Sequence, residues 1–129
     1  MDPETLRALG RDGERDIASV VRAVREGTVR FEDLVLPTEG KAYWEGAALV
    51  LRELRDDIPP PVVPLLLEWL LDSNWPGHDV ILQVLRHQTR RVVFKPLMEM
   101  IAAEATAGDQ DAVENLVDLL KALPAGDPE

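Results

Sequence analysis

The chain has 129 residues and no cysteine, so it has the size of one domain, and both a disulfide scaffold and a thiolate metal site are excluded. Its formal net charge of −10 argues against a nucleic-acid ligand, because binding to phosphates depends on lysine and arginine. No apolar run reaches the roughly 18 residues of a membrane span and the N-terminus lacks the apolar stretch of a signal peptide, so we expect a soluble, cytoplasmic protein with no membrane partner.

The first two elements are predicted to be short helices. Asp2 followed by Pro3 is typical of a helix start, and Gly10 is typical of a stop. From about residue 13 to residue 26, apolar residues recur at helical spacing and indicate an amphipathic helix: Ile17, Val20, Val21 and Val24. Residues 28–38 are predicted to be an irregular connection with one turn of helix, while the partial alternation of apolar residues leaves a short strand open.

A longer helix is expected next, capped by Thr38 or its neighbour and extending to about Asp57. Its apolar residues form one broad stripe: Tyr43, Trp44, Ala47, Ala48, Leu51 and Leu54. Three prolines at 59–61 then break the chain. A polyproline ligand is the alternative interpretation of these prolines, but the apolar run that follows at once favours the start of a helix.

Residues 62–71 are predicted to be the central core helix, because they are apolar at every position except Pro64 and Glu68. Such a helix is hydrophobic almost all round and has to be covered on several sides. A polar break follows at 72–74, and Pro76 stands where the first turn of a new helix tolerates proline. The apolar side of that next helix is marked by Val80, Ile81, Val84 and Leu85.

Two further helices complete the chain. The first is expected from about 90 to 106, with Pro96 as a point where it can split and with these residues on its inner side: Val93, Leu97, Met98 and Ile101. Gly108 and Asp109 form the next corner. The last helix precedes Pro124 and is marked by Ala112, Val113, Leu116, Val117 and Leu120. Residues 125–129 are a polar tail.

Together these elements predict an all-α fold of about six helices with short connections. We expect a single helical domain over residues 1–129, frayed at 1–10 and 125–129. Successive helix pairs have comparable shape without an obvious sequence repeat, which favours stacked helical hairpins, as in HEAT-like arrays and other α-α superhelices. A closed irregular bundle is the alternative.

The string LLEWLLDSNWP at residues 66–76 has five distinctive positions: Trp69, Asp72, Asn74, Trp75 and Pro76. It resembles the signature of a family of small bacterial proteins of unknown function with HEAT-like helical repeats, whose members carry the motif Leu-Leu-x-Trp-Leu-x-Asp-x-Asn-Trp-Pro. The resemblance covers 11 residues, supports the fold and implies no catalytic residues.

The motif also has a direct physical interpretation. Asp72 and Asn74 are suited to bonding unsatisfied backbone groups at the corner, while Trp69 and Trp75 supply bulky apolar faces that lock two helices at a fixed angle. The alternative is a ligand-binding aromatic site, but these residues already have structural roles, and we favour the structural interpretation.

Candidate reaction chemistry is sparse. His78 and His87 are nine positions apart, which separates them by about 13 Å along one helix and prevents them from sharing a metal ion. Ser73, His78 and Asp79 contain the residue types of a catalytic triad, but three such residues within seven positions do not give its geometry. We therefore expect no cofactor, no metal site and no enzymatic activity.

Charge is distributed unevenly along the C-terminal half. A basic island consists of Arg86, Arg90, Arg91 and Lys95. An acidic stripe on the last helix consists of Asp111, Glu114 and Asp118, which are spaced by three and four and therefore share one side. The stripe is either an ordinary solvated face or a surface for a basic partner. The basic island is the other candidate partner surface, and we favour the stripe.

Two functions fit this sequence. The first hypothesis is a non-enzymatic protein–protein interaction module, in one version a bacterial immunity-type protein that binds a basic toxin or enzyme at the acidic stripe. The second is a small-molecule-binding protein or enzyme with an aromatic pocket lined by Tyr43, Trp44, Trp69 and Trp75. Aromatic residues at such spacing more often belong to a core, so we favour the first.

Overall fold

The computed structural model describes residues 2–10 and 15–123, which form seven α-helices and four short 3-10 helices and contain no β-strand. The prediction of an all-α fold is confirmed, while the polar tail expected at 125–129 lies outside the described residues. The α-helices are α1 (Pro3–Leu9), α2 (Ile17–Arg25), α3 (Trp44–Glu53), α4 (Val63–Glu68), α5 (His78–His87), α6 (Arg90–Ala107) and α7 (Gln110–Ala122). The 3-10 helices are η1 (Phe31–Leu34), η2 (Lys41–Tyr43), η3 (Pro60–Val62) and η4 (Trp69–Leu71).

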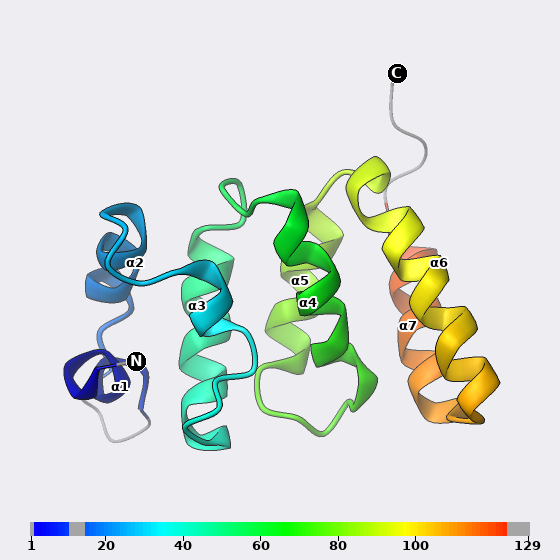
Figure 1. Cartoon of the computed structure of the whole chain (residues 1–129), viewed down its shortest axis with the longest axis horizontal. Coiled ribbons are helices and arrows are strands. Elements are labelled where there is room, and N and C mark those ends of the chain that lie inside the picture. The colour runs from blue at the N-terminus through cyan, green and yellow to red at the C-terminus, as the bar shows by residue number, and fades with distance from the viewer. Residues whose placement is uncertain (1, 11–14, 124–129) are drawn as a thin grey trace.

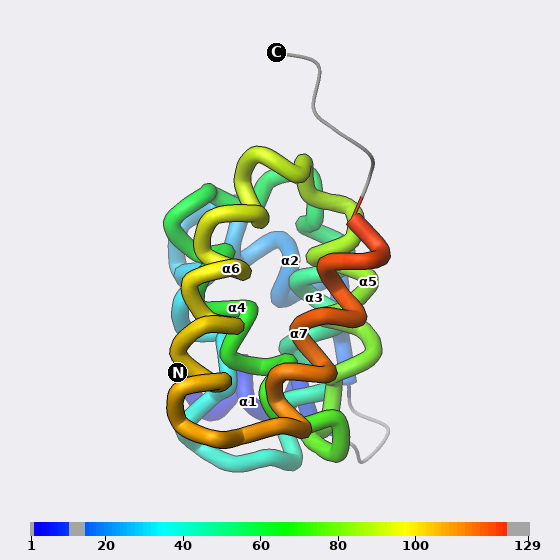
Figure 2. Tube along the Cα trace, turned by 90° about the vertical axis from the view of Figure 1, so that its right-hand side faces the viewer, coloured from blue at the N-terminus to red at the C-terminus, as the bar shows by residue number. Residues whose placement is uncertain are grey.

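The helices form an elongated row in which neighbours along the chain pack side by side (Figure 1). Viewed from the C-terminal end, α4 and α6 lie on one side of the row and α5 and α7 on the other (Figure 2). Helix α3 packs against α5 and α5 against α7, while α4 packs against α6. Helix α6 and helix α7 therefore make up the last hairpin of the array, and nothing in the described residues packs beyond them.

The N-terminal helices begin where the sequence offers an acidic cap. Asp2 accepts a hydrogen bond from the Thr5 backbone at 2.7 Å, and Asp16 accepts one from the Ser19 backbone at 3.2 Å, so α2 begins at Ile17 rather than near 13.

Helix α1 contacts α3 at Gly46, where a Cβ atom would lie 2.2 Å from the Leu9 carbonyl oxygen. Only glycine allows this close approach of α1 to α3.

Residues 28–38 contain one helical turn, η1, and no strand, in agreement with the expected irregular segment. Helix α3 begins later than predicted, since Thr38 lies in the loop and regular α-helix starts only at Trp44 after the short turn η2. A side-chain hydrogen bond accompanies this later start. The indole N–H of Trp44 donates to the Pro37 carbonyl at 2.8 Å, which folds the preceding loop back onto the start of the helix.

The central segment is continuous from η3 through α4 to η4. Its core side is fully buried and includes Leu66, Leu67, Trp69 and Leu70. The segment is not enclosed all round, however, because Leu65 is 38% exposed. Helix α4 packs on α5, α6 and η4 from its inner side only, so its outer side faces solvent.

Helix α6 continues through Pro96 without a break, so the predicted split does not occur. Val93 and Leu97 are buried as expected, but Met98 is 39% exposed instead of facing inward. Met98 follows Leu97 by one residue, which is a turn of about 100° around the helix and carries it past the edge that contacts α4 and α7.

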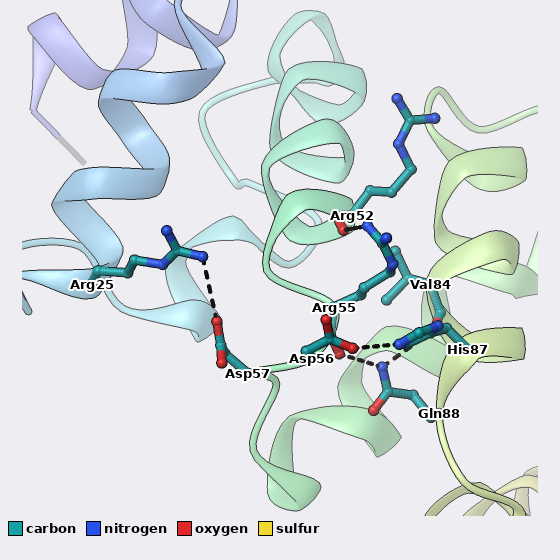
Figure 3. Close-up of polar contacts among 8 residues, drawn as sticks. All are labelled: Arg25, Arg52, Arg55, Asp56, Asp57, Val84, His87 and Gln88. Atoms are coloured by element: carbon teal, nitrogen blue, oxygen red, sulfur yellow. Dashed lines mark hydrogen bonds and ion pairs between the residues drawn. The ribbon is translucent and has the colours of Figure 1, made fainter.

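A polar clamp joins the end of α3 to the end of α5 (Figure 3). The side chain of Gln88 donates to the carbonyl of Arg55 at 2.8 Å and to that of Val84 at 3.3 Å. Beside it, Nε2 of His87 lies 2.5 Å from a carboxylate oxygen of Asp56. The clamp fixes the loop between α3 and α4 against the neighbouring hairpin.

A second contact in the same loop reaches the N-terminal part of the array. Nη2 of Arg25 on α2 lies 3.6 Å from a carboxylate oxygen of Asp57, and both side chains are more than half exposed (Figure 3). Such an exposed pair contributes little to stability.

Among the described helices, none combines the length and apolar character that crossing a bilayer requires.

Candidate functional site

Three tryptophans pack together where α3 meets the corner between η4 and α5. The ring of Trp44 stands edge-on to Trp69, with centroids 6.0 Å apart, and to Trp75, with centroids 5.6 Å apart. The indole N–H groups of Trp44 and Trp69 both donate to backbone carbonyls, the first to Pro37 and the second to Pro76, each at 2.8 Å. Trp69 is completely buried, whereas Trp44 and Trp75 are half-buried.

The corner itself is held by an Asp side chain. Asp72 accepts a hydrogen bond from the Asn74 backbone N–H at 2.8 Å, which is the local turn expected of an aspartate in this position. Asn74 contributes its backbone to this turn, and the residue is exposed. Gly77 caps α5 in a left-handed conformation, with φ of 86°, and Pro76 supplies the carbonyl bound by Trp69.

This corner borders a surface hollow of about 720 Å³ together with the beginning of α7. The contact between the two walls is supported by Asn115, whose side-chain amide donates to the Leu71 carbonyl at 3.5 Å. The residues that line the hollow are Leu71, Asp72, Ser73, Asn74, Trp75, Asp109, Asp111, Glu114 and Asn115. We call it the acidic hollow, because four of these residues carry carboxylates and none is lysine, arginine or histidine.

Two of the four carboxylates are fixed by backbone donors. Asp72 is held by Asn74, and Asp109 caps α7 by accepting from the Ala112 backbone at 3.1 Å. The other two, Asp111 and Glu114, belong to exposed residues in the first turns of α7. The hollow therefore combines two carboxylates that backbone N–H groups hold in place with two on exposed residues in the first turns of α7.

The acidic stripe and the corner motif, which are about 40 positions apart in sequence, thus meet at one place. Asp111 and Glu114 line the hollow, while Asp118 is exposed one helical turn further along α7 and does not line it. Sequence reasoning missed Asp109 and Asn115 as members of this site. Asp109 had a local signal as a helix cap, but its closeness to Asp72 depends on the packing of η4 against α7.

The basic island lies at the other end of the last hairpin. Arg86 lies in the last turn of α5, and the remaining members occupy the N-terminal half of α6: Arg90, Arg91 and Lys95. Because α6 and α7 run in opposite directions, the start of α6 is far from the start of α7 (Figure 1). The guanidinium of Arg90 lies over the Phe94 ring, 4.7 Å from its centre.

The histidines do not contribute to this site. Nδ1 of the buried His78 lies 3.3 Å from a carboxylate oxygen of Asp79, and His87 belongs to the polar clamp at the far end of α5. The described residues hold no group of three or more histidine, cysteine or acidic side chains arranged to bind a metal ion. Ser73 lines the acidic hollow and also, together with His78, a smaller hollow of about 100 Å³, and the buried Nε2 of His78 has no hydrogen-bond partner among the described residues. The four carboxylates make the acidic hollow suited to attracting cations.

Comparison with known proteins identifies a protein family. No curated protein and no solved structure matches the chain. One protein family, described as a domain of unknown function (DUF5071), matches residues 43–123, which includes the tryptophan cluster, the corner and the whole acidic hollow. Since the match covers well over half of the 129 residues, the chain belongs to the DUF5071 family.

Proposed function

We propose that this protein is a non-enzymatic protein–protein interaction module, and that the acidic hollow binds a basic segment of its partner. The observation that carries the proposal is the convergence of the corner at 71–75 and the start of α7 on one hollow with four carboxylates and no cationic side chain. A surface of one sign attracts an oppositely charged partner and speeds its association.

The chemistry of the hollow suits a lysine or arginine side chain. Carboxylates accept charge-assisted hydrogen bonds from ammonium and guanidinium groups, and the half-buried Trp75 adds an aromatic face beside them. Because Asp72 and Asp109 are already held by backbone N–H groups, their positions require little further ordering when a cation binds.

The wider setting of the proposal is a HEAT-like array of helical hairpins that works in the cytoplasm. In such arrays each hairpin contacts its neighbours, and the exposed side of a hairpin is free to bind a partner. The version that we favour is an immunity-type protein that covers a basic toxin or enzyme, since the net charge of −10 and the acidic hollow both suit a basic partner.

The alternative of an aromatic-lined ligand pocket has less support. Trp44 and Trp69 pack against each other, and their indole N–H groups already have backbone partners. Trp75 borders the acidic hollow and a smaller one of about 100 Å³ beside His78, so it is the member of this cluster that a ligand can reach.

The test compares two triple charge reversals that change the net charge equally. The first reverses Asp111, Glu114 and Asp118 to lysine, and the control reverses Glu26, Glu32 and Glu53, which are also exposed but lie in the N-terminal half. Binding of a short lysine-rich peptide is measured by titration at low and at high salt.

We expect the first variant to weaken binding at least about tenfold while the control retains most of it, and we expect binding of the unmodified chain to weaken as salt rises. Both variants keep their thermal stability, because exposed charges contribute little to folding. Equal losses in the two variants would mean that only the net charge matters, and the proposal would be wrong.

A further inference from the structure

The outer face of α6 carries exposed apolar side chains at helical spacing. Phe94 and Met98 are each 39% exposed, and the alanines at 102 and 105 continue the same side of the helix toward its C-terminus. On the adjacent α4, Leu65 is 38% exposed. These three are the large apolar residues that stand out as exposed among the described residues, and they lie on two neighbouring helices.

This placement is unusual for the end of a helical array. Terminal units normally present a polar outer face, because nothing packs on them. Helix α6 belongs to the last hairpin (Figure 2), yet Phe94 and Met98 in its middle are each 39% exposed. An exposed apolar face rimmed by charged residues marks a surface for association.

We propose that a second copy of this chain covers the face, with α6 of one copy packed antiparallel on α6 of the other about a two-fold axis. Two features of α6 make it complementary to itself in this orientation. The first is side-chain size. With the axis at the midpoint of Arg90–Ala107, Phe94 in one copy stands at the level of residue 103 in the other, between the two small side chains Ala102 and Ala105.

The second feature is charge. Lys95 and Glu99 are exposed on the same flank of the apolar stripe, with Lys95 before the midpoint and Glu99 just after it. The two-fold axis brings the same flanks of the two helices together. It places Lys95 of one copy about 4.5 Å along the axis from Glu99 of the other, within reach of both side chains. Symmetry forms this pair twice.

A parallel arrangement lacks both features, because it would set Phe94 against Phe94 and would bring opposite flanks of the two helices together, so that Lys95 and Glu99 of the two copies would not face each other. The proposed surface is separate from the acidic hollow, which is lined by the corner and the start of α7 and by no residue of α6. Self-association through α6 therefore does not depend on the proposed binding of a basic partner.

The experiment measures the dissociation constant of the full-length chain by sedimentation as a function of concentration. The variants are Lys95→Glu and Glu99→Lys, which alter exposed positions and are not expected to disturb folding. Each single variant sets like charges against each other twice, so we expect each to weaken the dimer about tenfold or more. Asp118→Lys on α7 changes the net charge as much as Glu99→Lys does and should leave the dimer unchanged.

The most direct measurement is the sedimentation of a mixture of the two single variants. The first carries two glutamates on the flank and the second carries two lysines, so the mixture should form heterodimers at least as tightly as the unmodified chain forms homodimers. If Lys95 and Glu99 interacted only within one chain, mixing the two variants would not restore dimer formation. A chain that stays monomeric at all concentrations, single variants that dimerise like the unmodified chain, or a mixture that stays monomeric would each overturn the proposal.

Discussion

The indole N–H of Trp69 donates a hydrogen bond at 2.8 Å to the backbone carbonyl of Pro76, seven residues further along the chain. Trp69 is completely buried, so water cannot easily replace this bond. The bond ties the end of the central segment to the corner that follows. Since that corner forms one wall of the acidic hollow, the bond also connects the core to the candidate site.

Replacing Trp69 by phenylalanine is expected to lower the free energy of unfolding by about 1–3 kcal/mol, because the Pro76 carbonyl loses its donor. Trp69→Ala should cost more, about 3–5 kcal/mol, since it also leaves a cavity. Urea denaturation measures both. Trp75→Phe is the control, because Trp75 is half-buried, and its effect should be clearly smaller. Equal effects of Trp69→Phe and Trp75→Phe would show that the buried hydrogen bond does not hold the corner.

Gly77→Ala is expected to lower the thermal stability of the protein for two reasons. The residue has a positive φ, and the added Cβ would also collide with neighbouring atoms. An added Cβ would lie 2.9 Å from the Ala48 side chain and 3.1 Å from the Trp69 ring. Gly27 has nearly the same φ, 85° against 86°, but a Cβ there would meet nothing within 4 Å. Gly27→Ala should therefore show only the conformational cost of about 1 kcal/mol, and the excess for Gly77→Ala measures the close packing of the corner on α3. Equal losses of thermal stability would contradict that packing.

Local sequence patterns predicted the helices of this fold well, because capping residues, prolines and apolar spacing act within a few positions. Asp2 and Asp16 cap helices, and Val93 and Leu97 are buried. The errors arose where tertiary contacts decide. Helix α3 begins only at Trp44, whose indole bonds back to the Pro37 carbonyl, and no periodicity reveals this contact.

The predicted burial of some apolar residues was the other source of error. The sequence does not show which side of a helix another helix will cover. Leu65 and Met98 were expected inside and are partly exposed, because α4 and α6 are packed from one side only. The acidic hollow was only half predicted for a similar reason. Asp111 and Glu114 share a stripe on one helix, but the distant Asp72 joins them through the packing of η4 on α7.

Asn115→Ala is expected to loosen the contact between the two walls of the acidic hollow, which the packing of η4 on α7 still holds together. The Asn115 amide donates to the Leu71 carbonyl at 3.5 Å, a long hydrogen bond, so its loss should cost about 1 kcal/mol or less in urea denaturation. Affinity for a lysine-rich peptide should fall by a factor of about two to five, because the carboxylates of the corner and of α7 are held less firmly relative to each other. Unchanged affinity would mean that the two walls bind independently.

Gln88→Ala is expected to loosen the polar clamp between α3 and α5. Gln88 donates to two carbonyls, those of Arg55 and Val84, so its loss should lower the free energy of unfolding by about 1 kcal/mol. Gln83→Ala is a matched control, because Gln83 makes a single exposed contact with Arg52 at 3.3 Å and should change stability by less than about 0.5 kcal/mol. Two variants of equal stability would show that the clamp adds nothing.

The central claim, that the acidic hollow binds a basic segment, is tested most directly by following the backbone amide signals of the isotope-labelled chain by NMR during titration with a lysine-rich peptide. We predict saturable shifts concentrated at residues 71–75 and 109–118, absent with a neutral peptide of the same length and weakened by salt. Shifts spread evenly over all exposed acidic residues, including Glu26, Glu32 and Glu53, would contradict the claim.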